Sequence, residues 1–532
     1  MAEKSQTVGE ALVTMLEQAG VDTVFGIPGV HTIELYRGLA ASSIRHVTPR
    51  HEQGAGFMAD GYARASGKPG VCFVITGPGL TNTLTAMAQA RADSIPMLVI
   101  SGVNATTTLG KGCGHLHELP DQAGLIRTVA LSTHTLTEPS RLAEVLEQAF
   151  SVMTAARPGP VHIEIPIDVM KLPAAGRTFK MPEAAPLSPS VAAFKRAAQL
   201  CAASESPVIL IGGGAVRHAA AVRAFAEALD APVVNTTNAR GVMANHSLDV
   251  PASPSLGSVR SLLGQADLVL ALGTELGPTD MDMYQDGGFA LPENLIRVDI
   301  DADQLLRGAP AALPVRADLG AFIAGMLVLS PIWAKIEGRN GSARAKLARD
   351  MALAEIGDAY RQHINLVQRI WDILPDATIV GDSTQLVYAG NMYVSVPGPA
   401  TWFNSATGFG TLGYAAPAAI GAALGKPGHP AVALLGDGGF QFTLSELGSA
   451  RDCNADVAFL VWNNSGYMEI ETAMTSVDIA PIGVTPSAPD FSIIATAYGL
   501  PSRRVSNAED LLTALKDLPR PCLIEYLDNP DD

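Results

Sequence analysis

Short apolar runs that alternate with longer amphipathic stretches dominate this sequence of 532 residues. The runs have the length of strands and are almost continuously apolar, a pattern typical of parallel strands that are buried on both faces of a sheet. The stretches between them have helical spacing: one expected helix places Val8, Leu12, Met15, Leu16 and Ala19 on a single face. Strands that alternate with helices predict an α/β protein.

The alternation falls into three segments, and the length of the chain also suits several domains. We predict three consecutive domains, residues 1–172, 190–330 and 355–532, each with a central parallel sheet flanked by helices. A Pro-rich connection (172–190) and a basic linker (329–350) separate them. The expected strands are Asp22–Phe25, Val71–Ile75, Met97–Ser101, Val161–Ile165, Val208–Ile211, Val233–Asn235, Leu268–Leu272, Ile296–Ile300, Thr378–Val380, Ala431–Leu435, Val457–Trp462 and Cys522–Tyr526.

Composition narrows the class of partner and compartment. A net charge of −16 argues against nucleic acid or an anionic membrane surface as a partner. The amino terminus lacks the pattern of a secretion signal, and the apolar runs are too short to span a bilayer. The 5 cysteines are scattered and form no CxxC pair, which suits a reducing compartment. We therefore expect a cytoplasmic protein.

A carboxylate and an amide follow two neighbouring expected strands of the third segment. Asp437 comes directly after Ala431–Leu435, and Asn464 comes after Val457–Trp462. The carboxyl ends of parallel strands meet at one edge of a sheet, and their side-chain oxygens suit Mg²⁺. Gly438 and Gly439 let backbone N–H groups approach a diphosphate. The pattern predicts a magnesium and diphosphate site.

A second candidate site lies in the first segment, where the stretch Arg50–Arg64 has the pattern of a helix with Glu52 in its first turn. One interpretation is an acid stabilised by the helix dipole. The other follows from the small and apolar residues around Glu52, which would desolvate the carboxyl, raise its pKa and let it share a proton with a ring nitrogen.

Together these motifs resemble the thiamine-diphosphate-dependent acetohydroxyacid synthase and benzoylformate decarboxylase superfamily. The resemblance also runs through Thr76–Asn82 and through Gly159–Val169, so it covers all three segments. It implies a pyrimidine-binding domain, a central Rossmann-like domain and a diphosphate-binding domain. It further implies a homodimer at minimum, with a homotetramer expected, in which the first domain of one subunit and the third of its partner form the active site.

The resemblance also assigns roles to individual residues. Asp437, Asn464 and the Gly466 carbonyl would hold Mg²⁺, with Tyr467 beside the cofactor. Glu52 would hydrogen-bond the aminopyrimidine ring of thiamine diphosphate.

Four further positions match elements that contact the cofactor in the superfamily. The Gly410 carbonyl and the Leu412 side chain would hold the cofactor in a bent conformation. Ser383 and Thr384 match residues that contact the diphosphate, although helix capping explains these hydroxyls equally well.

Several positions bear on the substrate. Glu469 and Ile470 match the place where relatives contact the substrate tail, although a solvated position on a helix would explain Glu469 as well. If Glu469 lines the pocket, its buried carboxylate would need a cationic partner such as a guanidinium. His31 and His117 are candidate proton relays, or else structural histidines. In the synthases Gln-Glu stands where this chain has His117-Glu118, so a residue of their active centre is changed.

Within the superfamily the chain looks most similar to the 2-ketoarginine (5-guanidino-2-oxopentanoate) decarboxylases. The hypothesis is non-oxidative decarboxylation of a 2-oxo acid with a basic tail to an aldehyde. Two alternatives stay open: carboligation of pyruvate, as in an acetohydroxyacid (acetolactate) synthase, and an inactive cofactor-binding scaffold.

The central segment raises the question of a nucleotide or flavin. The run Gly212-Gly213-Gly214 after a strand resembles a dinucleotide-binding turn but lacks its full spacing, so a tight strand-to-helix turn is the alternative. The segment Gly273–Asp282 lacks the Arg-Phe-Asp-Asp element of the flavin-binding synthases, which argues against FAD.

Overall fold

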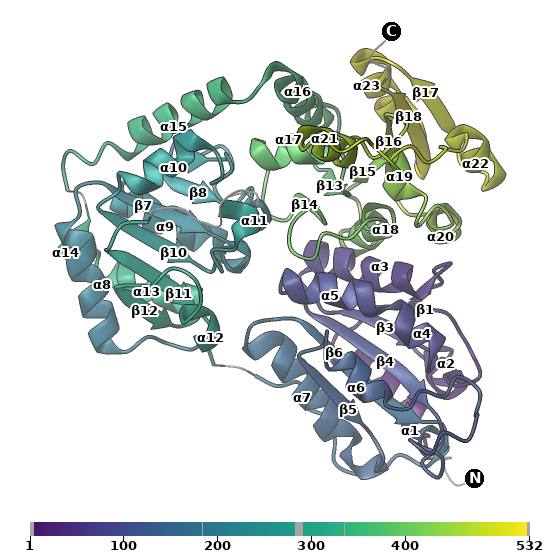
Figure 1. Ribbon diagram of the computed structural model, residues 1–532. Coiled ribbons are helices and arrows are strands. Elements are labelled where there is room, and N and C mark those ends of the chain that lie inside the picture. The colour runs from purple at the N-terminus through teal and green to yellow at the C-terminus, as the bar shows by residue number, and fades with distance from the viewer. Residues whose placement is uncertain (1–4, 184, 282–290, 335, 529–532) are drawn as a thin grey trace. The chain divides into compact units, whose positions relative to one another are not determined.

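The computed structural model describes residues 5–183, 185–281, 291–334 and 336–528 (Figure 1). They fall into two compact units, the first made of residues 1–184, 409–506 and 518–532 and the second of residues 185–408 and 507–517.

The described strands form three six-stranded sheets, in which every described strand pair is parallel. The first has the order β2-β1-β3-β4-β6-β5, the second β12-β11-β10-β7-β8-β9 and the third β14-β13-β15-β16-β18-β17. The fold class predicted from the sequence, α/β with three parallel sheets flanked by helices, is confirmed.

The strands of the first sheet are β1 (Thr23–Gly26), β2 (Arg45–Val47), β3 (Gly70–Val74), β4 (Met97–Val103), β5 (Ser132–Thr135) and β6 (Pro160–Pro166). Those of the second are β7 (Pro207–Ile211), β8 (Val233–Asn235), β9 (Asp249–Val250), β10 (Leu268–Leu272), β11 (Leu295–Asp299) and β12 (Leu313–Arg316). Those of the third are β13 (Thr378–Gly381), β14 (Trp402–Asn404), β15 (Ala431–Gly436), β16 (Val457–Asn463), β17 (Ser502–Val505) and β18 (Cys522–Leu527).

The helices of the first unit are α1 (Val8–Gln18), α2 (Ile33–Leu39), α3 (Glu52–Ser66), α4 (Pro78–Asn82), α5 (Leu84–Ala92), α6 (Gln122–Ile126), α7 (Leu142–Ala155), α18 (Ala415–Gly425), α19 (Asp437–Phe440), α20 (Glu446–Asp452), α21 (Met468–Ser476) and α22 (Phe491–Ala497), with 3₁₀ turns at Pro139–Arg141 and Val169–Lys171. Those of the second are α8 (Val191–Ala203), α9 (Ala219–Leu229), α10 (Gly257–Gly264), α11 (Pro278–Met281), α12 (Ala302–Leu305), α13 (Leu319–Val328), α14 (Ser330–Trp333), α15 (Gly341–Glu355), α16 (Asp358–Ile373), α17 (Gln385–Met392) and α23 (Ala508–Asp517), with 3₁₀ turns at Gly213–His218 and Thr237–Ala239.

Helix α3, which carries Glu52, has an uninterrupted buried stretch: residues 54–63 are all buried. The His51 side chain caps its amino terminus by accepting a hydrogen bond from the Gln53 N–H, and Gly67 ends it in the left-handed conformation. A Cβ on Gly61 would lie 2.0 Å from the Ala418 carbonyl oxygen. Helices α3 and α18 therefore pack with their backbones in contact.

In the second unit, the glycine-rich turn after β7 packs against the turn after β10. A Cβ on Gly212 would lie 2.4 Å from the Gly273 carbonyl oxygen, and one on Gly214 would lie 3.0 Å from the Gly273 Cα. This close approach accounts for the glycines as a tight structural turn, the alternative that the sequence left open. Of the segment 273–282, in which the flavin element is missing, residue 282 lies outside the described residues.

In the part of the chain that the structure describes, no helix combines the length and the hydrophobicity needed to cross a bilayer.

Candidate active site

The predicted metal ligands lie at the ends of two adjacent strands. Strands β15 and β16 pair in parallel, with Gly436 opposite Trp462, so both end at the same edge of the sheet. Asp437 follows β15 directly and is the first residue of α19, while Asn464 follows β16. Only 1% of the Asp437 surface is exposed, so its carboxylate lies inside the protein.

The Asn464 amide, the Gly466 carbonyl oxygen and the Asp437 carboxylate converge at this edge. The terminal atom of the Asn464 amide that faces the site lies 2.9 Å from the Gly466 carbonyl oxygen and 3.2 Å from Asp437 Oδ1. With the amide oxygen in that place, three oxygens face one another. With the amide nitrogen there, the amide donates to both neighbours. The second carboxylate oxygen, Asp437 Oδ2, is buried without a hydrogen-bond partner.

This arrangement fits a divalent cation. A buried carboxylate oxygen without a donor, such as Asp437 Oδ2, is costly unless a cation binds there. Carboxylate, amide and carbonyl oxygens are the ligands that Mg²⁺ takes, with its other positions left to water and phosphate. Burial raises the pKa of Asp437, and backbone N–H groups offset this in part. Asp437, Asn464 and Gly466 can thus hold the predicted metal.

The turn that carries Asn464 and Gly466 has little room to vary. Ser465, between the two, has a φ of +63°, a left-handed conformation that non-glycine residues rarely adopt. A Cβ on Gly466 would lie 2.7 Å from the Val484 carbonyl oxygen, which also accepts a hydrogen bond from the Tyr467 N–H. The ring of Tyr467 packs so closely on Gly438 that a Cβ there would lie 2.4 Å from it.

Glu52 lies half-buried at the first position of α3. Asn82 donates a hydrogen bond from Nδ2 to Glu52 Oε2 at 2.9 Å. The other oxygen lies beside Gly79, where a Cβ would stand 3.3 Å from Glu52 Oε1. The segment Thr76–Asn82 thus shapes the surroundings of the carboxylate, with one oxygen bound by an amide and the other beside a glycine.

A second carboxylate holds the start of α3. Glu446, the first residue of α20, is fully buried and accepts hydrogen bonds from the backbone N–H groups of Arg50 and His51 at 3.0 and 3.2 Å. Ser449 donates to its other oxygen at 2.6 Å, and a Cβ on Gly54 would lie 2.3 Å from Glu446 Oε1. Burial raises the pKa of Glu446 to about 7.

The two candidate histidines come together. The rings of His31 and His117 have centroids 5.4 Å apart and meet edge to face. His31 is buried and its Nδ1 has no hydrogen-bond partner. Burial, and to a lesser extent His117, lowers the pKa of His31. The backbone of His117 lies against Gly77, where a Cβ would meet its carbonyl oxygen at 2.6 Å.

The segment 408–413, predicted to shape the cofactor, contains three left-handed glycines: Gly408, Gly410 and Gly413. Gly410 is exposed with a φ of +74°, and Leu412 is half-buried. Gly413 has a φ of +79°, and a Cβ there would lie 2.7 Å from Phe442 Cβ. Thr443 donates a hydrogen bond to the Gly413 carbonyl at 3.0 Å, which fixes the end of the segment.

Ser383 and Thr384 lie in the second unit, after β13. Thr384 occupies the N-cap position of α17, but its side chain makes no capping hydrogen bond. Simple capping therefore does not explain this hydroxyl. Asp382, which the sequence analysis did not single out, is fully buried and accepts a hydrogen bond from the Ser383 N–H at 2.9 Å.

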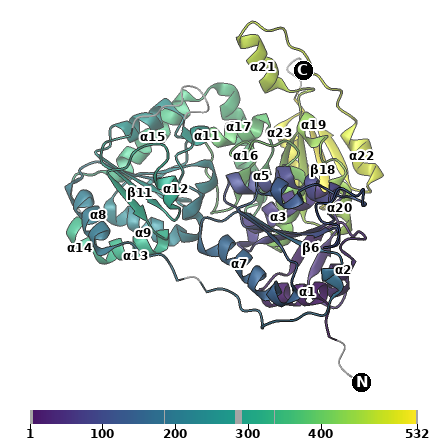
Figure 2. The same cartoon turned by 60° about the horizontal axis from the view of Figure 1, so that its bottom comes forward.

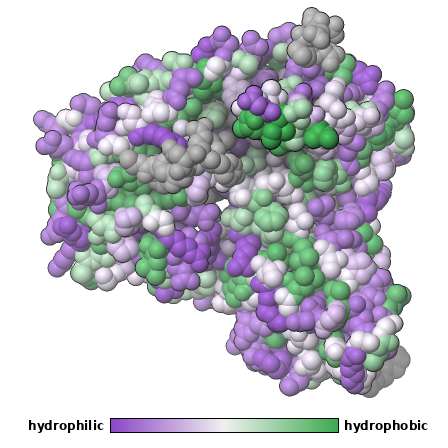
Figure 3. Space-filling model, in the orientation of Figure 1, coloured by the Kyte–Doolittle hydropathy of each residue, from purple (hydrophilic) through white to green (hydrophobic). Residues whose placement is uncertain are grey.

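The predicted substrate residues lie on α21, of which no residue is buried. Glu469 and Ile470 are exposed in the first turn, together with a second acidic residue, Glu471. Helix α21 projects from the rest of its unit in Figure 2, and Figure 3 shows apolar side chains gathered over it. Exposed apolar side chains of this segment are Ile470, Val477, Ile479 and Ile482.

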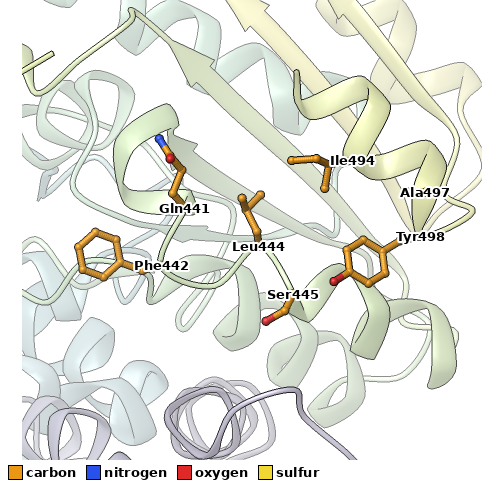
Figure 4. A pocket seen from close by; sticks show the side chains of 7 residues that line it. All are labelled: Gln441, Phe442, Leu444, Ser445, Ile494, Ala497 and Tyr498. Atoms are coloured by element: carbon orange, nitrogen blue, oxygen red, sulfur yellow. The ribbon is translucent and has the colours of Figure 1, made fainter. Parts of the chain in front are cut away.

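A shallow depression of about 540 Å³ lies on the surface of the first unit (Figure 4). Gln441, Phe442 and Leu444, from the connection between α19 and α20, line one side, and Ile494 and Tyr498 line the other. None of the predicted site residues lines it, so the depression is a separate feature of the surface.

Comparison with known proteins places these features in a family. Three family models match the chain: "Thiamine pyrophosphate enzyme, N-terminal TPP binding domain" at residues 6–125, "Thiamine pyrophosphate enzyme, central domain" at 194–326 and "Thiamine pyrophosphate enzyme, C-terminal TPP binding domain" at 382–526. Asp437 and Asn464 lie within the C-terminal match, and Glu52 within the N-terminal one.

Curated relatives match the chain over nearly its whole length. It is 43% identical over 516 residues to "Probable 2-ketoarginine decarboxylase" of Pseudomonas aeruginosa, with 96% of this chain and 91% of the relative covered. It is 30% identical over 539 residues to "Acetolactate synthase isozyme 1 large subunit" of Escherichia coli (98% and 94% covered). It is also 30% identical over 548 residues to "Acetolactate synthase" of Mycobacterium bovis (97% and 86% covered). The chain therefore belongs to the thiamine pyrophosphate enzymes, a family whose cofactor is thiamine diphosphate.

Proposed function

We propose that this protein is a thiamine-diphosphate-dependent decarboxylase that converts a 2-oxo acid with a cationic tail, such as 5-guanidino-2-oxopentanoate, to an aldehyde and CO₂. The observation that carries the proposal is the 43% identity, over 96% of the chain, to a probable 2-ketoarginine decarboxylase. The acetolactate synthases cover as much of the chain at 30% identity.

Thiamine diphosphate would supply a nucleophilic carbon and an electron sink for the bonding pair that stays behind when CO₂ leaves. The chain's own residues bind and orient it. Asp437, Asn464 and the Gly466 carbonyl would hold Mg²⁺, and the metal would help to bind the diphosphate. Gly438 and Gly439 would leave room for the diphosphate, and Ser383 and Thr384 would donate hydrogen bonds to it. Gly410 and Leu412 would set the conformation of the cofactor, with Tyr467 beside it.

Three further side chains manage protons. Glu52 would hydrogen-bond the pyrimidine ring through the oxygen that Asn82 does not bind, while the Asn82 amide keeps the carboxyl oriented. His31 and His117 would relay a proton to the product. Burial lowers the pKa of His31, so its ring is neutral at rest and must accept a proton before it can pass one on.

The acidic first turn of α21 supports the choice of substrate. Glu469 and Glu471 follow the metal turn directly, and both are carboxylates in a segment that is otherwise rich in exposed apolar residues. A guanidinium is a planar donor that a carboxylate binds with two parallel hydrogen bonds. Ile470 contacts the aliphatic part of the same tail.

A paired substrate assay tests the proposal. Turnover of 2-ketoarginine, pyruvate and an uncharged 2-oxo acid of similar length is measured with thiamine diphosphate and Mg²⁺, following aldehyde, acetolactate and CO₂. We expect aldehyde and CO₂ from 2-ketoarginine. In the Glu469→Gln variant, kcat/KM should fall at least about tenfold for 2-ketoarginine, because a charge-assisted hydrogen bond contributes about 1.5–3 kcal/mol. The uncharged acid should show no such change.

The other outcomes point elsewhere. Acetolactate from pyruvate, without turnover of 2-ketoarginine, would establish the synthase reaction. Bound cofactor without turnover of any of the three acids would indicate the inactive scaffold.

We also propose a homodimer at minimum, assembled as a homotetramer, with domains 1–172, 190–330 and 355–532 and the active site between two subunits. Support comes from exposed apolar side chains near the site, among them Phe409, Phe442 and Ile482, which are 55%, 57% and 78% exposed in the single chain. A cytoplasmic location is proposed because all five cysteines are free.

A further inference from the structure

The turn that holds two of the metal ligands is supported from behind by a buried polar chain. Asn463, the last residue of β16, precedes the ligand Asn464 directly. Its side-chain oxygen accepts a hydrogen bond from the Ser465 N–H at 3.1 Å. This bond spans Asn464, ends on the N–H of the left-handed Ser465, and so holds the conformation in which Asn464 and the Gly466 carbonyl face Asp437.

The chain continues into the neighbouring strands. The amide nitrogen of Asn463 donates to Glu525 Oε1, on β18, at 2.9 Å. The other oxygen, Oε2, accepts a hydrogen bond from Arg504 Nε, on β17, at 2.8 Å. Glu525 is 1% exposed and Asn463 8% exposed, so the bonds lie in the protein interior, while the Arg504 side chain is 43% exposed.

We propose that Asn463 and Glu525 are positioning residues for the metal site. Arg504 fixes the Glu525 carboxylate, which fixes the Asn463 amide, and the amide in turn fixes the peptide between the two metal ligands. Groups behind a metal site orient its ligands, and their loss typically weakens metal affinity by about 10–100-fold. The proposal rests on the metal site proposed above and not on the identity of the substrate.

Exchanging the amide of residue 463 and the carboxylate of residue 525 gives a direct test. In Glu525→Gln, the new amide nitrogen must face another donor, either the Asn463 amide nitrogen or Arg504 Nε. In Asn463→Asp, two carboxylates face each other. In the double variant, the new Gln can donate to the new Asp and accept from Arg504, and the Asp can still accept from the Ser465 N–H. The double variant also keeps the net charge of the wild-type protein.

The measurement is the Mg²⁺ dissociation constant of the full-length, cofactor-stripped protein, titrated calorimetrically at saturating thiamine diphosphate. We expect each single variant to bind Mg²⁺ about 10–100-fold more weakly, and the double variant to recover most of the affinity. Asp490→Asn is the matched control: Asp490 also contacts Arg504, at 3.1 Å, but it does not reach Asn463, so Mg²⁺ affinity should stay unchanged.

Folding is followed in parallel by the unfolding midpoint without Mg²⁺. Unchanged Mg²⁺ affinity in a folded Glu525→Gln protein would overturn the proposal, and so would a double variant no better than the singles. If Glu525→Gln does not fold, Arg504→Gln decides, because it releases Glu525 from the exposed end of the chain of bonds. Wild-type affinity in that variant also overturns the proposal. A wild-type protein that binds no Mg²⁺ would instead remove the metal site itself.

Discussion

The surroundings of Glu52 and those of Asp437 differ in how their oxygens are satisfied. Around Glu52, the chain supplies an amide donor from Asn82, and Glu446 holds the backbone just before it. Around Asp437, the carboxylate oxygen Oδ2 is buried without a partner, and the Asn464 amide and the Gly466 carbonyl lie close by. The Glu52 carboxylate is thus oriented by groups of the protein, whereas the Asp437 carboxylate keeps an oxygen that a cation would satisfy.

The comparison predicts that substitutions at Glu52 mainly lower the rate of catalysis, whereas substitutions at Asp437 mainly weaken the binding of metal and cofactor. The largest effect is expected for Glu52→Gln, which removes a proton-sharing carboxyl and keeps the shape of the side chain. We expect kcat to fall by about 10²–10⁴-fold, the usual contribution of general acid–base catalysis, while calorimetric affinity for Mg²⁺ and thiamine diphosphate changes little. Retained turnover would contradict the role of Glu52.

The second-largest effect is expected for Asp437→Asn, at the predicted metal site, and concerns the stabilisation of the protein by its ligands. A ligand at 100 times its dissociation constant stabilises the folded state by about 2.7 kcal/mol. The wild-type protein should show this gain on addition of Mg²⁺ with thiamine diphosphate, and the variant should show none. Without ligands the variant should be at least as stable as the wild type, because it loses a buried carboxylate with a raised pKa. Thermal unfolding with and without ligands measures both.

The smallest expected effect is a pH dependence of stability that comes from Glu446, the carboxyl group that holds the backbone just before Glu52. Burial raises the pKa of Glu446 from 4.5 to about 7, so between these values the folded protein keeps a proton that the unfolded chain releases. The contribution of Glu446 to stability therefore falls as pH rises from 4.5 to 7, by about 1–3 kcal/mol. Glu446→Gln should remove this slope in unfolding titrations. The exposed Glu509→Gln serves as control and should leave the slope in place.

The sheets show which strands a sequence reveals. Each strand expected from an apolar run is an inner strand of its sheet, as β3 and β16 are, and each missed strand is an edge: β2, β5, β9, β12, β14 and β17. Inner strands of a parallel sheet are covered on both faces and so are continuously apolar. Edge strands such as β5, Ser-Thr-His-Thr, are short and polar, and no apolar pattern marks them.

The residues of the candidate site also divide into those that the sequence reveals and those that it hides. Asp437, Asn464 and Glu52 could be predicted as site residues because short sequence motifs contain them. Glu446 and Glu525 could not, since each acts on a backbone or side chain that is distant along the chain, as Glu446 does on Arg50. Such pairs depend on how helices and strands pack, and nothing in the local sequence indicates them. The glycines at 54 and 466 are required because other groups approach the backbone closely there. The sequence shows these glycines but does not indicate which groups approach them.

The contact between α3 and α18 bears on the construction of chimaeras. Gly61 lies against the Ala418 carbonyl, and Gly421 against the Met58 carbonyl, where a Cβ would be 1.9 Å from the oxygen. Even one methyl group at either glycine must push the two helices apart. A pyrimidine-binding domain grafted from another enzyme will therefore pack against α18 only if its own helix has a glycine at the position of Gly61. In a chimaera, the residues at positions 61 and 421 should be chosen, or randomised, together with the residues that they contact.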